Sequence, residues 1–226
     1  MNDLLAMLSA AGPLAGGWGI HGLWMRRCVS AARRDPLSGL WTRAPFERRA
    51  ARLLARNPHT AVVLVDLDGF KALNDTFGHA AGDAAIRFVG GSFVGALAGQ
   101  HGAVAARLGG DEFAAVVPLA DPVSLPWLLS GLHGEIAAPF RHGGRDLVLG
   151  ASIGAALSSD LFPDVRRAGP ESLSVLLRLA DEAMYAAKRA GGGWNYPGAT
   201  EQRCTTAAGR RAGRPGTHIA HREEAA

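Results

Sequence analysis

Apolar residues follow two kinds of spacing along the middle of this chain. A β-branched run at 61–66 (AVVLVD) predicts a buried strand that ends in an acid. Residues 45–56 and 171–190 place apolar side chains at helical spacing, which predicts two amphipathic helices. Residues 70–99 predict two further helical pieces that are broken near Gly78. This mixture of helices and strands indicates one compact unit.

Glycines mark the turns between the remaining predicted elements. Two apolar runs at 103–108 and 112–117 flank Gly109-Gly110-Asp111, a pattern typical of a β-hairpin. Residues 146–157 (DLVLGASIGAAL) predict another strand, whose glycines allow a second backbone to approach closely. Three consecutive glycines at 191–193 end the last helix. On that helix, Asp181 and Tyr185 are expected to attach it to the core.

The N-terminal segment has a different composition. Residues 4–25 contain no charged side chain, and this length is enough to cross a bilayer, but five glycines and a proline lower its hydrophobicity. Two interpretations stay open, a segment that spans or touches a membrane and a packed or dimerising helix. The arginines that follow would keep the next domain in the cytoplasm if the segment spans. We therefore expect an N-terminal segment at 1–34, a globular domain at 35–198 and a disordered polar tail at 199–226.

Composition narrows the class of protein. With 226 residues, 48% of them hydrophobic and 19% charged, the chain is not an intrinsically disordered protein. Its two cysteines are far apart, which excludes a disulfide scaffold and fits a reducing compartment. The net charge of +4 comes without interleaved aromatic residues, so we expect a solvated arginine-rich surface and no nucleic-acid partner. Only two of the 24 basic residues are lysines, Lys71 and Lys188.

Four acids lie where the predicted strands end. Asp66 closes the buried strand, Asp68 follows it, and Asp111 and Glu112 stand at the hairpin. Carboxylates beside a tight turn are often simple turn residues. If the two strands are neighbours in one sheet, however, Asp66 and Asp111 converge, and carboxylate oxygens are the ligands that Mg²⁺ prefers.

Several motifs resemble those of a known family. Residues 66–83 (DLDGFKALNDTFGHAAGD) and 107–113 (RLGGDEF) resemble the GGDEF domain of diguanylate cyclases, enzymes that join two GTP molecules into cyclic di-GMP. Residues 35–43, 151–156 and 178–191 resemble the opening and closing elements of the same domain, in the same order. The resemblance implies an α+β fold, a two-layer, palm-like domain whose five-stranded, mainly antiparallel sheet is flanked by helices, as in nucleotidyl cyclases.

The resemblance also implies roles for particular residues. A carboxylate pair and a backbone carbonyl would hold Mg²⁺, while the start of a helix and a distant lysine would bind the triphosphate. The residues concerned are Asp66, Leu67 and Asp111 for the metal; Phe70, Lys71 and Lys188 for the triphosphate; and Asp111, Glu112 and Lys71 for catalysis. Between Asp111 and Glu112, the identity of the proton acceptor stays open.

Guanine recognition would belong to Asn74 and Asp83. A carboxylate accepts two hydrogen bonds from guanine, which adenine does not supply at that edge. Nine residues apart on one uninterrupted helix, the two side chains would lie on opposite faces. They converge only if the helix breaks between them, and Gly78 is placed to break it.

Some positions depart from the family pattern, and one pair supports the structure. Gly192 stands where the family has an arginine that helps to neutralise the terminal phosphate. Gln100 and Ala103 replace the arginine and aspartate of the usual product-inhibition site. Arg107 is expected to pair with Asp35, as the corresponding residues do in the family.

The leading hypothesis is a Mg²⁺-dependent diguanylate cyclase that works as a symmetric homodimer, with one GTP bound to each subunit. Its product would act indirectly, through separate cyclic di-GMP receptors in bacterial signalling. The alternative is a non-catalytic GTP-binding module that regulates a partner. The catalytic domain is expected in the cytoplasm, and residues 4–25 would attach it to the inner face of the membrane if they are not a packed or dimerising helix.

Overall fold

A five-stranded sheet forms the centre of the molecule, for which a computed structural model describes residues 33–161 and 170–197. Its strands, in spatial order, are β2 (Val104–Gly109), β3 (Glu112–Pro118), β1 (Thr60–Asp68), β6 (Gly150–Leu157) and β7 (Gly193–Asn195). Every neighbouring pair is antiparallel except β6 and β7. The five-stranded, mainly antiparallel α+β sheet is therefore confirmed.

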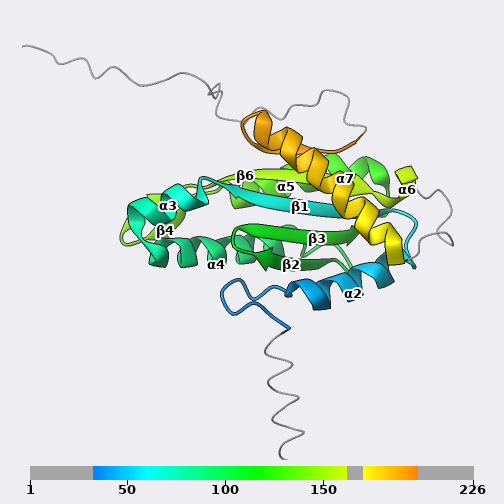
Figure 1. Cartoon of the computed structure of the whole chain (residues 1–226), viewed down its shortest axis with the longest axis horizontal. Coiled ribbons are helices and arrows are strands. Elements are labelled where there is room, and N and C mark those ends of the chain that lie inside the picture. Colours follow the sequence, from blue (N-terminus) through cyan, green and yellow to red (C-terminus); the bar gives the residue numbers. More distant parts are fainter. Residues whose placement is uncertain (1–32, 162–169, 198–226) are drawn as a thin grey trace, which may run out of the picture.

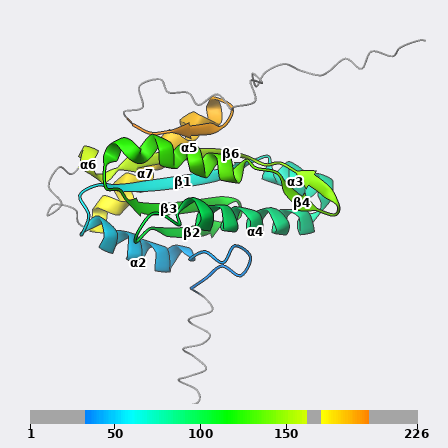
Figure 2. The same ribbon diagram turned by 180° about the vertical axis from the view of Figure 1, so that it is seen from behind.

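Helices cover both faces of this sheet (Figures 1 and 2). On one face lie α2 (Arg43–Leu54) and α7 (Pro170–Arg189), and on the other lie α4 (His79–Ala96) and α5 (Leu125–Ile136). The short α3 (Phe70–Phe77) connects the end of β1 to α4. The flanking helices are as expected, but they make three layers where two were expected.

The central strand explains why both faces need cover. Val63 and Val65 of β1 belong to the hydrophobic cluster beneath α4 and α5, whereas Val62 and Leu64 belong to the cluster beneath α2 and α7. Side chains alternate across a strand, so a continuous apolar run is stable only when both sides are buried. The run at 61–66 thus accounts for a layer of helices on each side.

Some predicted boundaries and contacts are wrong. The helix expected at 45–56 begins at Arg43 and ends at Leu54. The single strand expected at 146–157 is two strands, because β5 (Arg145–Leu147) pairs with β4 (Phe140–His142) in a separate two-stranded sheet. Asp181 and Tyr185 do not attach α7 to the core, since both side chains are exposed. Their helical face is the one that α7 turns away from the sheet.

The remaining elements are short, and they complete the described part of the chain. A 3₁₀ turn (Pro122–Ser124) leads into α5, and α6 (Ser158–Leu161) follows β6. Among the residues that the structure describes, none forms a helix long and apolar enough to cross a membrane. The segment at 4–25 and the tail at 199–226 lie outside the described residues.

Candidate active site

The acids gather at the end of β1, on the face covered by α2 and α7. Asp66 lies directly opposite Glu112 of β3 and Ser152 of β6. Residues directly opposed in a sheet direct their side chains to the same face. The turn between β2 and β3 brings Asp111 to this point, because the backbone N–H of Leu67 donates a hydrogen bond to the Asp111 carbonyl oxygen at 3.3 Å. Asp66 and Asp111 therefore converge, as the sequence predicts.

The tight hairpin turn depends on glycine. Gly110 has a φ of +51°, in the left-handed region that other residues rarely adopt. Gly109 pairs with Glu112, so that only Gly110 and Asp111 form the turn. Because the turn is so short, Asp111 lies directly beside the end of β1.

A close approach between α7 and β6 places Lys188. A Cβ at Gly154 would overlap the Ala180 carbonyl oxygen and the Met184 backbone nitrogen, so the helix rests directly on the strand at this glycine. One helical turn after Met184, the Lys188 Nζ donates a hydrogen bond of 2.6 Å to the Asp66 Oδ1. Gly154 of β6 thus lets Lys188 reach Asp66, which lies 122 positions earlier in the sequence.

The Lys188 ammonium lies in the field of three carboxylates. Its hydrogen bond to Asp66 and the charges of Asp66, Asp68 and Asp111 raise the pKa of Lys188, so the amine stays protonated at neutral pH. The Lys188 ammonium therefore lies where carboxylate oxygens converge. Converging carboxylate oxygens are also what a divalent ion requires. This arrangement fits the predicted Mg²⁺ site.

The third predicted ligand contributes only its backbone. The Leu67 side chain is buried in the core with 2% of its surface exposed, so its carbonyl oxygen is the group it can offer. Within the described residues, no three His, Cys, Asp or Glu side chains gather as a metal-binding group. A metal at this place would thus need the Leu67 carbonyl and substrate oxygens besides Asp66 and Asp111.

Asp68 and Ser152 belong to the same cluster, and the sequence reasoning assigned them no role. The Ser152 hydroxyl donates to the Asp68 carboxylate at 2.9 Å and 3.1 Å, and burial raises the pKa of Asp68. The signal was present in the alternation of β1, which puts Asp68 on the same face as Asp66. Gly192 lies against this carboxylate and has a φ of +99°. A Cβ atom at this position would lie 3.0 Å from the Asp68 Oδ2 atom. An arginine at 192 would be strained and would meet Asp68.

The beginning of α3 offers backbone donors beside the acids. Gly69 precedes the helix in a left-handed conformation, and no side chain caps the first N–H groups. Phe70 is partly buried against the core, and Lys71 is exposed on the first turn. Free N–H groups with a lysine beside them attract phosphate oxygens. Lys71 makes no ion pair with any residue in the described ranges.

The two residues expected to recognise guanine lie on neighbouring helices. The helix breaks at Gly78, whose φ is +83°, and α4 folds back beside α3. The Asn74 carboxamide then lies against Gly82, where a Cβ would overlap its Oδ1 atom. Asp83 is the next residue, and its carboxylate lies 3.9 Å from Arg87. The break therefore brings Asn74 against the residue that precedes Asp83, whereas a joint recognition of guanine by Asn74 and Asp83 stays a prediction.

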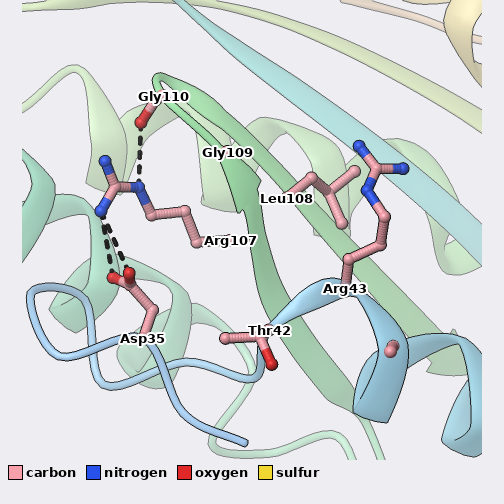
Figure 3. A pocket seen from close by; sticks show the side chains of 8 residues that line it. Asp35, Thr42, Arg43, Arg107, Leu108, Gly109 and Gly110 are labelled. Carbon is pink, nitrogen blue, oxygen red and sulfur yellow. Dashed lines mark hydrogen bonds and ion pairs between the residues drawn. The ribbon is translucent and has the colours of Figure 1, made fainter. Parts of the chain in front are cut away.

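Arg107 connects the hairpin to the segment before α2 (Figure 3), and it pairs with Asp35 as predicted. Its Nη1 atom lies 3.2 Å from both Asp35 carboxylate oxygens, and its Nε donates to the Gly110 carbonyl oxygen at 2.9 Å. Burial alone would raise the pKa of Asp35, but hydrogen bonds from Ser38 and Arg107 lower it below the usual value. This pair holds the glycine turn in position.

Glu112 has a different neighbour from Asp111. Its carboxylate lies 3.9 Å from the Arg43 guanidinium of α2, and both side chains are about half exposed. Arg43 lines the open groove beside the hairpin with Asp35, Arg107, Gly109 and Gly110 (Figure 3). Glu112 is thus oriented by a cation on its own face of the sheet.

Comparison with known proteins agrees with this geometry. The family described as diguanylate cyclase, GGDEF domain, matches residues 32–193. An uncharacterised 19.3 kDa protein of Streptomyces ambofaciens is 44% identical over 76% of this chain and 87% of its own length. The diguanylate cyclase TpbB of Pseudomonas aeruginosa is 37% identical over 70% of this chain. The matched part is only 35% of the length of TpbB.

A solved structure shares the fold. The coiled coil and GGDEF domain of DgcB from Caulobacter crescentus, in complex with c-di-GMP, has a TM-score of 0.65 and 26% identity. The match covers 84% of this chain and 96% of that one. The similarity thus includes both the sheet and the helices that carry the acids and the lysines.

Proposed function

Because this chain belongs to the GGDEF domain family, we propose that it is a diguanylate cyclase, which converts two GTP molecules into cyclic di-GMP and two pyrophosphates. The observation that supports this most is the Lys188 ammonium held by Asp66 at 2.6 Å, beside Asp111 and the free N–H groups of α3. Cation-binding carboxylates next to phosphate-binding donors are what phosphoryl transfer requires.

The reaction assigns a role to each part of the site. The 3′-oxygen of one GTP attacks the α-phosphorus of the other, a new P–O bond forms, and the bond to pyrophosphate breaks. Lys71 and the first N–H groups of α3 hold the triphosphate in line, and Lys188 neutralises its terminal charge once it leaves Asp66. Asp111 or Glu112 accepts the proton of the 3′-hydroxyl group.

Asp66, Asp111 and the Leu67 carbonyl would hold Mg²⁺. The chemistry that bound Mg²⁺ supplies is neutralisation of charge on the phosphates and a lower pKa of the attacking hydroxyl. The chain itself orients the two carboxylates, since one lies on a paired strand and the other in a two-residue turn. Mutation of either acid therefore removes a ligand without disturbing the core.

One site holds one GTP, so the ring closes only when two subunits face each other. A two-fold axis would place each 3′-hydroxyl at the partner's α-phosphate, and the same bond would form twice. We therefore propose a homodimer as the active species. The product would act on separate receptors in cyclic di-GMP signalling, and we propose the cytoplasm as the location of the domain. Residues 4–25 would serve either as a contact to the inner face of the membrane or as a packed or dimerising helix.

The test is incubation of the purified full chain with GTP and Mg²⁺, followed by identification of products by mass spectrometry. We expect cyclic di-GMP and pyrophosphate in a ratio of one to two. Asp66→Asn and Asp111→Asn should fold normally and lower turnover by orders of magnitude, because they remove ligand charge at constant size. Asp146→Asn, an exposed carboxylate of β5, serves as the control. Unchanged rates in both site variants would exclude the metal assignment.

A second candidate function has one observation in its favour. Gly192 replaces the phosphate-binding arginine of the family, and its φ of +99° is a backbone conformation that an arginine rarely adopts. A module that binds GTP without turnover, and so regulates a partner, would tolerate this change. GTP binding by calorimetry with no product by mass would favour that function over cyclisation.

A further inference from the structure

The positive charge of the chain is concentrated in one stretch. Residues 33–56 carry seven arginines and only two acids, Asp35 and Glu47. Since the whole chain has a formal net charge of +4, all of its surplus positive charge comes from this stretch. In the structure these residues form α2 and the segment that leads into it, beside the edge strand β2 (Figures 1 and 2).

Two of these arginines enclose an aromatic ring. The guanidinium carbon of Arg34 lies 3.8 Å from the centroid of the Trp41 ring, and that of Arg49 lies 3.5 Å from it. One face of an indole has no room for both groups at such distances, so the two guanidiniums lie on opposite faces. The cation–π attraction holds two like charges close together at a fixed place.

Further arginines surround this stacked group. Phe46, Ala50 and Leu54 turn one side of α2 to the core, which directs Arg48 and Arg52 to the opposite, exposed side. Burial and the positive charges of Arg33, Arg34, Arg52 and Arg48 lower the pKa of Arg49. The arginine patch therefore consists of Arg33, Arg34, Arg48, Arg49 and Arg52.

The arginine patch has no acidic partner within the structure. None of its members forms an ion pair with a carboxylate of the described residues, although other arginines of the chain do. Within the described residues, Arg34 donates to the carbonyl oxygen of Gly39 and Arg49 to that of Pro45. Five neighbouring cations without a counter-charge repel one another, and an external polyanion would relieve this repulsion.

We propose that the arginine patch is the surface by which this domain binds an anionic lipid membrane. One observation speaks against single-stranded nucleic acid as the occupant. Both faces of Trp41 are covered by guanidiniums, so no aromatic face is free to stack on a base. None of the exposed large apolar side chains of the described residues lies on α2 or in the segment before it, so the arginine patch would bind headgroups by charge and not by insertion.

The chain also brings the arginine patch close to an apolar segment. Only residues 26–32 separate the uncharged stretch at 4–25 from Arg33. Seven residues reach at most about 25 Å even when fully extended. Any membrane that receives the apolar segment therefore lies within reach of the arginine patch, and basic residues next to such a segment bind anionic headgroups.

The experiment is sedimentation of the full chain with vesicles of phosphatidylglycerol mixed with phosphatidylcholine, and with vesicles of phosphatidylcholine alone. The second set measures binding through the apolar segment by itself. The test variant is Arg48→Gln with Arg52→Gln. The matched control is Arg141→Gln with Arg145→Gln, two exposed arginines of the β4–β5 hairpin that carry the same charge change. Circular dichroism and the melting temperature verify folding of both.

We expect stronger binding to the anionic vesicles, and a loss of that excess at high salt. Each arginine near an anionic surface contributes a factor of about five, so the test variant should bind about 25-fold more weakly. The control variant and binding to neutral vesicles should be unchanged. Equal losses in both variants, or no preference for anionic vesicles, would overturn the proposal. Displacement of the chain from anionic vesicles by RNA, with the same dependence on Arg48 and Arg52, would assign the surface to nucleic acid.

Discussion

At the scale of single residues, Lys188 is the most informative side chain of the candidate site. It lies within hydrogen-bond distance of Asp66, and the resemblance assigns it to the triphosphate. The Lys188 ammonium must leave Asp66 when a divalent ion binds to that carboxylate. It must also leave Asp66 in order to bind a phosphate. Nucleotide and metal should therefore help each other to bind, because both remove Lys188 from Asp66.

This gives a prediction that needs no turnover. In Lys188→Met the competing cation is absent, so Mn²⁺ should bind about three- to tenfold more tightly in the absence of nucleotide, as measured by electron paramagnetic resonance. Turnover of GTP should fall at the same time. Arg189→Met, one residue further along α7, should leave the affinity for Mn²⁺ unchanged. Equal affinity in the wild type and Lys188→Met would refute the competition.

Asp35 leads to a prediction about pH. Its pKa is lowered on folding from the usual 3.8, so the stabilisation by Arg107 and Ser38 is present above that pH and disappears as the pH falls through the lower, folded-state value. Asp35→Asn should therefore lower the melting temperature at pH 7, and this deficit should shrink in strong acid. Asp146→Asn provides the exposed control. A deficit that does not change with pH would mean that Asp35 acts by shape and not by charge.

At the scale of elements, the glycines of α4 have different functions. Gly82 makes room for Asn74, whereas a Cβ at Gly91 would meet nothing within 4 Å. Both lie within the same helix, where glycine is unfavourable by about 0.5–1 kcal/mol relative to alanine. One glycine is therefore required by a side chain of the neighbouring helix, and the other is not.

The two glycines make a matched pair of variants. Gly91→Ala should raise the melting temperature and leave nucleotide binding unchanged. Gly82→Ala should displace the Asn74 carboxamide and weaken binding of a non-hydrolysable GTP analogue by about fivefold, the effect of one hydrogen bond. An ATP analogue should be less affected. Equal nucleotide binding in both variants would show that Asn74 does not contact the base.

At the scale of the whole molecule, the loop between α4 and β2 lies where the family has its usual product-inhibition site. Here Gln100 and Ala103 stand in the loop between them, joined by a backbone hydrogen bond of 3.1 Å. Neither side chain offers a charge to a phosphate or guanine. The adjoining hollow is lined chiefly by apolar residues, with Arg34 at its edge.

We therefore expect no strong inhibition by the product at this place. Initial rates with saturating GTP should stay nearly constant as cyclic di-GMP is added, with only weak competition at the active site. The measurement is the initial rate as a function of added cyclic di-GMP. Tight, non-competitive inhibition that persists in Gln100→Ala would reveal a different inhibitory site.

The local order of the chain determined much of the fold. The apolar run of β1, the glycine hairpin, the break at Gly78 and the helical spacing of α7 were each readable because they depend on neighbouring residues. The pair Asp35 and Arg107 followed from motifs that the family shares. The roles in binding and catalysis came from the resemblance to the family and not from any local pattern.

Contacts between distant segments were decided only by the tertiary structure. The strand expected at 146–157 divides because β4 pairs with its first residues, and no local pattern contains that partner. The apolar spacing of α7 predicted a helix that packs on the sheet. In the structure the side of α7 with Ala180 and Met184 rests on Gly154, and Tyr185 is therefore exposed. The encounter of Lys188 with Asp66 and the stacking of Arg34 and Arg49 on Trp41 likewise need the folded chain. Sequence patterns report which face of an element is apolar, whereas packing determines what that face meets.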